Sequence, residues 1–290
     1  MNIRFSSNNA RSRLSPRRSS GGAGCIRYVI AIVMAALALF SYLSSKQTNP
    51  VTGQDQYVSI TQEQEIAIGL QSAPEMINQF DGEDPDPQAQ QIVDMIGQEL
   101  VQSSLANQGD YPFEFHLLAD RETINAFALP GGQVFITRAL FDRLQTEGQL
   151  AGVLAHEIVH VIARHGAERI AETQLTQGLT GAVVLATYDP NDPRTQQTAA
   201  VAAMIGQLVN MKFGRDDEIQ SDSLGVKIMA QTGYDPRAMI EVMRILDEAS
   251  AGNRPPEFFS THPNPENRIA QIEAAIREVF PNGVPDNLRQ

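Results

Sequence analysis

The sequence has one cysteine and a shortage of basic residues. A single cysteine among 290 residues allows no intramolecular disulfide and no cluster of thiolate metal ligands. Lys and Arg number 22 against 34 Asp and Glu, and six of the arginines precede residue 28. The chain after residue 45 therefore carries 22 less 6, or 16, basic residues against all 34 acidic ones. We expect no nucleic-acid partner for so acidic a domain, and no electrostatic docking on anionic lipid.

The first 45 residues lack acidic side chains and contain one long apolar run. Residues 1–24 are basic and rich in Ser, Asn and Gly, which predicts a disordered tail. Residues 25–45 predict a transmembrane helix. Tyr42 and Leu43 occupy positions where signal peptidases need small residues, so we expect an uncleaved anchor rather than a signal peptide. The preceding arginines predict a cytoplasmic N-terminus and place the domain after the helix outside the cytoplasm, in the periplasm if the organism is bacterial.

The remainder predicts one domain with short flanks. Residues 46–60 predict a linker, residues 61–281 suffice for one domain with a sizeable core, and residues 282–290 form a tail. Strands are expected only between residues 112 and 137, so the expected fold class is α+β and mostly helical, with a small sheet beside the expected helix of residues 146–165. Helical periodicity recurs at residues 63–80, 89–105, 146–165, 197–213, 218–231, 236–249 and 265–280.

Two further apolar stretches, residues 178–188 and 199–209, are each too short to span a bilayer. They predict buried helices near the active-site cleft. A lid or a second membrane contact is the alternative for them.

The run from His156 to His160 places two histidines one helical turn apart, with Glu157 beside the first. Residues i and i+4 share a helix face, so both imidazoles can direct a nitrogen at one metal ion. Glu157 projects about 100° further round the helix, which suits a general base better than a third ligand. The pattern predicts one catalytic zinc ion. On a continuous helix His165 is rotated off the ligand face, which predicts a surface or supporting position for it.

A catalytic zinc needs a third protein ligand. A histidine six residues after His160 would supply one, but that position is Gly166. Glu218 is the best downstream candidate, and Asp222, on the same helical face, could accept the free N–H of a ligand histidine. The alternative for this segment is a solvated acidic helix start that complements the helix dipole.

Four blocks in a fixed order make the chain resemble a known family: residues 125–132, the zinc helix ending at Gly166, residues 218–236, and Ser260 to Pro263 followed by Arg268. The chain is similar, from about residue 60 to residue 279, to the membrane-associated gluzincin metallopeptidases that include HtpX, the CAAX prenyl proteases, LoiP and BepA. Its layout most resembles the periplasmic LoiP and BepA type, without a 34-residue helical repeat after the catalytic part. The oligomeric state is left open.

Residues 124–128 and 133–137 flank a Pro-Gly-Gly turn, which predicts a hairpin. The resemblance implies that the second strand is a sheet edge onto which an extended substrate adds. The residues of this expected edge are Gln133, Val134, Phe135 and Ile136. An ordinary structural hairpin is the alternative.

His262 and Arg268 are further catalytic candidates. His262 could stabilise the oxyanion of the tetrahedral intermediate or cap the zinc as a fourth ligand at rest. Arg268 could assist the oxyanion, or could instead be a helix-start arginine paired with Glu266 or Glu218.

The expected function is that of a membrane-anchored zinc endopeptidase with Glu157 as the base. The resemblance implies polypeptide substrates that are misfolded or close to the membrane, as in protein quality control. The alternative is a zinc-stabilised, chaperone-like binding scaffold whose peptidase activity is latent or lost. The glutamate beside the histidines argues against loss, because a scaffold needs the histidines but not Glu157.

Overall fold

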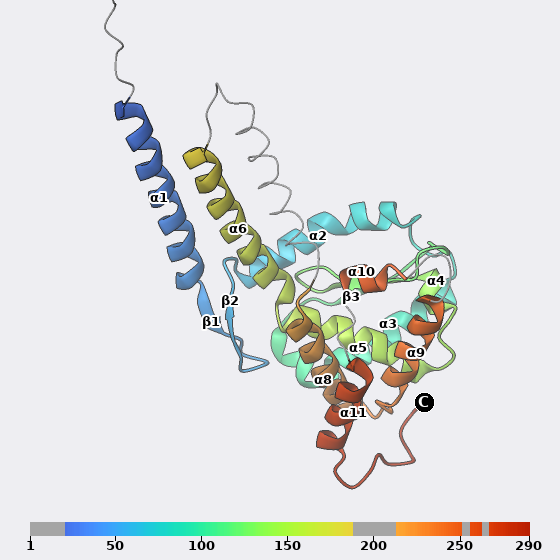
Figure 1. The fold of residues 1–290 in the computed structure, drawn as a ribbon. Coiled ribbons are helices and arrows are strands. Elements are labelled where there is room, and N and C mark those ends of the chain that lie inside the picture. The colour runs from blue at the N-terminus through green and yellow to red at the C-terminus, as the bar shows by residue number, and fades with distance from the viewer. Residues whose placement is uncertain (1–20, 188–212, 251–255, 263–266) are drawn as a thin grey trace, which may run out of the picture.

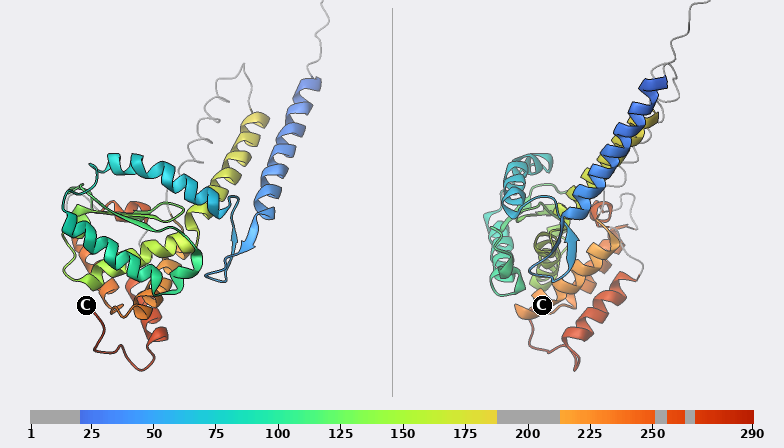
Figure 2. Two further views of the ribbon diagram at one scale, coloured as in Figure 1. Left: turned by 180° about the vertical axis from the view of Figure 1, so that it is seen from behind. Right: turned by 90° about the vertical axis from the view of Figure 1, so that its left-hand side faces the viewer.

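The computed structural model describes residues 21–187, 213–250, 256–262 and 267–290. In these residues, helices surround a small sheet, and two long helices project together from one side of the body (Figure 1; Figure 2). The arrangement confirms the expected α+β, mostly helical fold.

The first helix, α1 (Gly21–Ser44), contains the segment Ile26–Ser44, which is long and apolar enough to cross a membrane by length and composition, with a mean hydropathy of 2.1. It is followed by the hairpin of β1 (Lys46–Thr48) and β2 (Asp55–Tyr57). Helix α2 (Gln62–Gln79) begins at a capping box of Thr61 and Gln64. The next helices are α3 (Pro87–Gln102), which begins at the N-cap Asp86, and the short 3-10 helix η1 (Leu105–Gly109).

The sheet has three strands, β3 (Glu114–Leu118), β4 (Ala126–Ala128) and β5 (Gln133–Thr137). β4 and β5 form the predicted antiparallel hairpin, with Phe127 opposite Phe135. β3 joins the other side of β5 in parallel, so the strand order is β3-β5-β4. Val134 and Ile136 face the main core, whereas Phe135 faces a smaller cluster under α2, as the alternation of a strand requires.

The zinc helix of the sequence analysis is α5 (Glu147–Ile162), which follows the short α4 (Arg138–Phe141) and begins at the N-cap Thr146. Every residue from Gly148 to Ile162 is buried. The helix lies between α3, the sheet, α8 (Arg215–Gln231) and α9 (Ala238–Ser250). Two further helices complete the described chain, α10 (Phe258–Thr261) and α11 (Arg268–Val279), and α11 packs on α8 and α9.

The predicted helix 146–165 is interrupted. Arg164 has a φ of 63°, in the left-handed region, and the chain turns there into α6 (His165–Thr187). The Arg164 guanidinium holds this turn to α2, because its Nε donates a 2.7 Å hydrogen bond to the buried carboxylate of Glu65. Tyr111 donates a second bond, of 2.7 Å, to the same carboxylate.

Two expectations about the helices need comment. The apolar stretch 178–188 was expected to be buried beside the cleft, but the outer half of α6 projects from the body beside α1 (Figure 1). Its residues Leu179 and Val183 are 39% and 49% exposed, because α6 continues past the domain once it has left α5. The stretch 199–209 and nearly all of the predicted helix 197–213 lie outside the described residues, as do residues 1–20 of the expected tail.

The segment 46–60, expected to be a linker, instead folds against the end of α5. Asn49 is 1% exposed, and its side-chain amide donates 2.9 Å to the carbonyl of Ile162, the last residue of α5. Its Oδ1 accepts the backbone N–H groups of Val51 and Thr52, at 2.8 and 3.0 Å. One side chain therefore closes the hairpin loop and satisfies an end carbonyl of the zinc helix.

We predict that Asn49→Ala lowers the free energy of unfolding by about 2–3 kcal/mol, because it leaves one buried carbonyl and two partly buried N–H groups without their hydrogen-bond partner. Chemical unfolding in detergent, followed by circular dichroism, measures the change. Thr48→Ala is the control, because the Thr48 hydroxyl bonds only at the surface, to Asp55. Equal losses for the two variants would contradict the role given to Asn49.

Candidate metal centre

Helix α5 brings three side chains of its motif into the core. His156 and His160 are each 3% exposed and Glu157 is fully buried. The Nε2 atoms of the two histidines lie 3.1 Å apart, which is possible because residues four apart share a face of the helix. The predicted pairing of the two imidazoles is therefore present.

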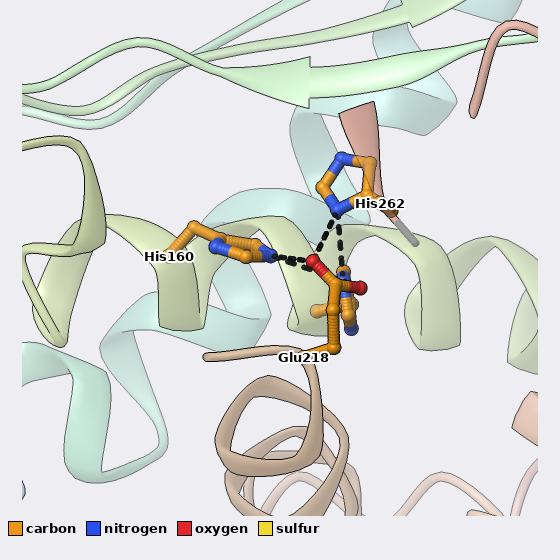
Figure 3. Close-up of side chains that lie close together, drawn as sticks. His160, Glu218 and His262 are labelled. Carbon is orange, nitrogen blue, oxygen red and sulfur yellow. Dashed lines mark hydrogen bonds and ion pairs between the residues drawn. The ribbon is translucent and has the colours of Figure 1, made fainter. Parts of the chain in front are cut away.

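Helix α8 packs along α5 and adds Glu218 to the same point (Figure 3). The Glu218 carboxylate is fully buried, with Oε2 3.4 Å from His156 Nε2 and Oε1 3.6 Å from His160 Nε2. The alternative of a solvated acidic helix start is therefore wrong for Glu218, although Asp216 is exposed. Burial alone would raise the pKa of Glu218, but His262 and His156 outweigh it and hold that pKa well below its usual range.

His262, directly after α10, completes a group of four. Its Nδ1 lies 3.1 Å from Glu218 Oε1 and 3.4 Å from His156 Nε2. In Figure 3 its ring points down toward Glu218 and His160 from the side opposite α8. One donor atom from each of these four residues lies within 4.8 Å of the others, and all four side chains are buried.

The spacing of the four donors fits zinc. Tetrahedral zinc with bonds of about 2.0–2.1 Å separates its ligand atoms by roughly 3.3 Å, the edge of that tetrahedron. The separations given above for five of the six pairs run from 3.1 Å for His156 and His160 to 3.6 Å for His160 and Glu218, and one donor atom from each residue lies within 4.8 Å of the others. The chemistry of the set, three imidazoles and one carboxylate, also suits zinc. These residues can hold one such ion.

Asp222 lies within hydrogen-bond distance of His156. Its Oδ1 lies 3.0 Å from His156 Nδ1 and accepts that N–H, which leaves Nε2 free for a metal. Burial alone would lower the pKa of His156, but Asp222 and Glu218 outweigh it and raise that pKa to about 9. Burial would raise the pKa of Asp222, but Arg268 and His156 hold it below its usual value, so the acceptor stays ionised.

Arg268 lies behind this pair. Its Nε and Nη2 donate to the two oxygens of Asp222 at 2.7 and 2.9 Å, and Nη2 lies 3.4 Å from Glu218 Oε2. The alternatives for Arg268 were a role at the oxyanion and an ion pair with Glu266 or Glu218. The structure shows the ion pair with Glu218, and Arg268 also forms a bidentate ion pair with Asp222. Glu266, the other partner considered, lies outside the described residues.

Of the two positions expected for His165, at the surface or in support of a ligand, the structure shows the supporting one, next to His160. The turn at Arg164 brings His165 Nδ1 to 2.9 Å from His160 Nδ1, and His165 Nε2 lies 2.6 Å from Gln220 Oε1. An amide oxygen can only accept, so His165 donates from Nε2 and accepts the N–H of His160 at Nδ1. His160 is thereby left with a free Nε2 for a metal, and burial together with the charge of His156 holds its pKa well below the usual value.

Aromatic rings enclose the cluster. Phe258 stacks on His262 with ring centres 4.5 Å apart, and the ring centre of Phe213 lies 4.2 Å from that of His160. Neither ring was predicted from the sequence. The one available signal was the position of Phe258 four residues before His262, which is one helical turn.

Glu157 is buried next to the cluster of His156, His160, Glu218 and His262. Its carboxylate oxygens have no hydrogen-bond partner among the residues that the structure describes, and Oε1 lies 3.6 Å from His262 Nε2. Burial raises the pKa of Glu157. A carboxylate of raised pKa is a stronger base than a free one, which suits it to accept a proton beside a metal site.

The expected substrate edge, Gln133 to Ile136, is wrong. These residues belong to β5, which is paired on both sides, and all of them are buried. The hairpin itself was predicted from local turn residues, but the parallel pairing of β3 with β5 places that strand at the centre. β4, which pairs only with β5, is the edge strand of this hairpin.

A buried helix with two histidines and a glutamate, set against a second helix that supplies a carboxylate, defines the metallopeptidase class. Residues 87–276 match the model of Peptidase family M48, and the chain belongs to that family. The resemblance seen in the sequence is thereby confirmed.

Several known proteins are similar in sequence to this chain. The chain is 32% identical over 274 residues to the beta-barrel assembly-enhancing protease of Escherichia coli (strain K12), covering 87% of this chain and 53% of that protein. It is 33% identical over 184 residues to the mitochondrial metalloendopeptidase OMA1 of Schizosaccharomyces pombe, covering 60% of this chain and 50% of that protein. With OMA1 of Danio rerio it shares 27% identity over 261 residues, 86% of this chain and 53% of that protein. The chain thus spans about half the length of these relatives.

We predict that His165→Ala weakens zinc binding by about 10- to 100-fold, because His160 loses the acceptor that fixes its ring. His165→Gln should recover part of the loss, since an amide oxygen can accept the same N–H. Competition with a chromophoric zinc chelator measures the affinity. His116→Ala is the control, because His116 lies on β3 and contacts Gln133 rather than the cluster; an unchanged affinity in His165→Ala would contradict the role of His165.

Proposed function

We propose that this chain is a membrane-anchored, zinc-dependent endopeptidase that rests with its site closed. The observation that carries the proposal is the buried set of His156, His160, Glu218 and His262, spaced as a tetrahedral zinc requires, with Glu157 beside it. Zinc bound there acts as a Lewis acid, which polarises a carbonyl and lowers the pKa of water.

The residues of the chain have distinct roles in this proposal. His156, His160 and Glu218 hold the metal. Glu157 takes a proton from the attacking water and later gives it to the leaving amine, a transfer that its raised pKa favours. Asp222 and Arg268 hold His156 in place from behind, through the contacts at 3.0, 2.7 and 2.9 Å.

His262 has two candidate roles, and the geometry favours that of a cap. Its Nδ1 lies among the donors, 3.1 Å from Glu218 Oε1, so with zinc bound His262 would be a fourth protein ligand where a catalytic site keeps an open position. Substrate can then enter only after the segment carrying His262 has moved away. An oxyanion role requires the same movement, after which Nε2 or Nδ1 of the displaced ring would face the carbonyl oxygen.

The edge of β4 that faces away from β5 is our candidate for substrate binding; in the closed site it contacts α10, and Ala126 is fully buried there. The N–H of Thr137 donates to the carbonyl of Asn125, and the N–H of Leu129 donates to that of Gln133. Because backbone groups alternate along a strand, those of Ala126 and Ala128 face away from β5. Phe258 of α10 donates 3.2 Å to the carbonyl of Ile124, so this edge begins next to the segment that carries His262. An extended peptide added to β4 would pass beside the metal cluster.

The location and substrates are part of the proposal. The helix α1 and the arginines before it support a cytoplasmic N-terminus with the catalytic domain on the other side of the membrane. Misfolded or membrane-proximal polypeptides would then be the substrates. The closed site also suits the alternative of a zinc-stabilised, chaperone-like scaffold, and the two are separated by the activity of the variants below.

We predict that Glu157→Gln retains zinc but lowers the rate of peptide cleavage by about 10²- to 10⁴-fold, because the amide cannot accept the proton. Metal analysis of the purified protein and hydrolysis of a quenched fluorescent peptide measure the two quantities. Removal of zinc by a chelator should abolish cleavage by the unmodified chain, and added zinc should restore it. Turnover of Glu157→Gln at the unmodified rate would refute the assignment of the base.

We also predict that His262→Ala cleaves the peptide several-fold faster, because the fourth zinc position is vacated. If His262 instead stabilises the oxyanion, the rate should fall by about 10²- to 10³-fold. Thr261→Ala is the control, since its hydroxyl only bonds the carbonyl of Phe258 within α10. No cleavage by the unmodified chain or by His262→Ala, with zinc bound in both, would favour the scaffold.

A further inference from the structure

The outer half of α6 lies against the middle of the membrane-spanning part of α1. A Cβ placed on Gly178 would lie 2.6 Å from the Cβ of Ala38, and one placed on Gly181 would lie 3.6 Å from the Cε of Met34. Rising numbers on α6 meet falling numbers on α1, so the two helices are antiparallel, as Figures 1 and 2 show. Met34 and Ala38 lie well inside the apolar segment Ile26–Ser44.

Along α6, charged residues give way to uncharged ones at the level where the apolar segment of α1 ends. The first two turns carry Glu168, Arg169 and Glu172, whereas residues 173–187 contain no charged side chain. The β1–β2 hairpin links this part of α6 to the end of α1. The N–H of Tyr57 donates 3.1 Å to Glu168, and the ring of Tyr57 stacks on that of Tyr42 near the end of α1, with ring centres 4.5 Å apart.

The two faces of this part of α6 also differ. Toward α1 the residues are small: Ala182 is 4% exposed, and Ala31 of α1 is 5% exposed although its neighbours on that helix are open. Small residues allow two helices to approach closely, as they do in membranes. Away from α1, Leu179 and Val183 present an apolar face at one-turn spacing, 39% and 49% exposed. Such a face is unfavourable in water and costs nothing in lipid.

We propose that residues 173–187 of α6 are inserted in the lipid bilayer beside α1, so that the chain enters the membrane with two packed helices. The proposal rests on the membrane anchor of the proposed function, because the depth of α6 is set by α1. Fifteen residues of helix extend about 22 Å, most of the roughly 30 Å of hydrocarbon. They do not need to span it.

The inserted segment would fix the distance between the site and the membrane. α6 begins at His165, which contacts the metal ligand His160, and its uncharged part begins eight residues later. At 1.5 Å per residue the metal cluster would lie about 12 Å from the hydrocarbon region of the bilayer, and closer to its headgroups. The cluster would therefore act on polypeptide within a few residues of the bilayer.

Spin labels on the full chain in liposomes of phosphatidylcholine and phosphatidylglycerol test the insertion. Single cysteines replace Leu179 or Val183 in a Cys25→Ser background and carry a nitroxide. Collision rates with oxygen, which concentrates in lipid, are compared with those of a water-soluble nickel chelate. Val33 on α1, 50% exposed, is the reference for lipid, and Met95 on α3, 54% exposed, is the reference for water.

We expect the collision rate with oxygen to exceed that with the nickel chelate several-fold for labels at Leu179 and Val183, as at Val33. At Met95 the collision rate with the nickel chelate should be the higher one. A water-like ratio at both α6 positions with a lipid-like ratio at Val33 overturns the insertion and leaves the anchor standing. Low collision rates with both reagents at both α6 positions overturn it too, since a second copy or another part of the chain would then cover that face. A water-like ratio at Val33 overturns the anchor and the insertion together.

Discussion

The burial of α5 is the constraint on which the rest of the site depends. Because the whole helix from Gly148 to Ile162 lies in the core, each polar group on it needs a partner from another element or a metal ion. Asp222 satisfies one nitrogen of His156, His165 satisfies one of His160, and Asn49 satisfies the carbonyl at the helix end. What remains unsatisfied is the inward-facing set that a zinc ion would occupy, together with the carboxylate of Glu157.

Those partners form two independent supports, one for each histidine. Arg268 and Asp222 reach His156 from α11 and α8, and Gln220 and His165 reach His160 from α8 and α6. The supports differ in charge, since an ion pair backs His156 and neutral groups back His160. This difference agrees with the raised pKa of His156 and the lowered pKa of His160, and both arrangements leave Nε2 directed at the same point.

What the sequence revealed depended on whether the information was local. The pairing of His156 with His160 and that of Glu218 with Asp222 follow from helix geometry alone, so both could be predicted. For His165 the sequence left two positions open, at the surface or in support of a ligand, because a continuous helix was expected where α5 ends at Ile162 and the chain turns at Arg164. The β4–β5 hairpin was likewise local, whereas its place in the sheet depends on a pairing of β5 with β3, a strand that precedes the hairpin and leaves no turn signal beside it.

The same distinction between local and non-local information explains why the sequence identified only α1 as a helix that could cross a membrane. A hydropathy count identifies α1, but the outer part of α6 is too short and too rich in Thr and Gly to qualify by itself. Its position follows from contact with α1, which no count along the chain contains. That contact matters for the site because α6 continues directly from α5, while the hairpin that follows α1 is bonded to the end of α5 through Asn49. Helix α5 is therefore attached to the pair of α1 and α6 at two points, one covalent and one hydrogen-bonded, and two attachments restrict rotation of the site relative to this pair in a way that a single flexible linker would not.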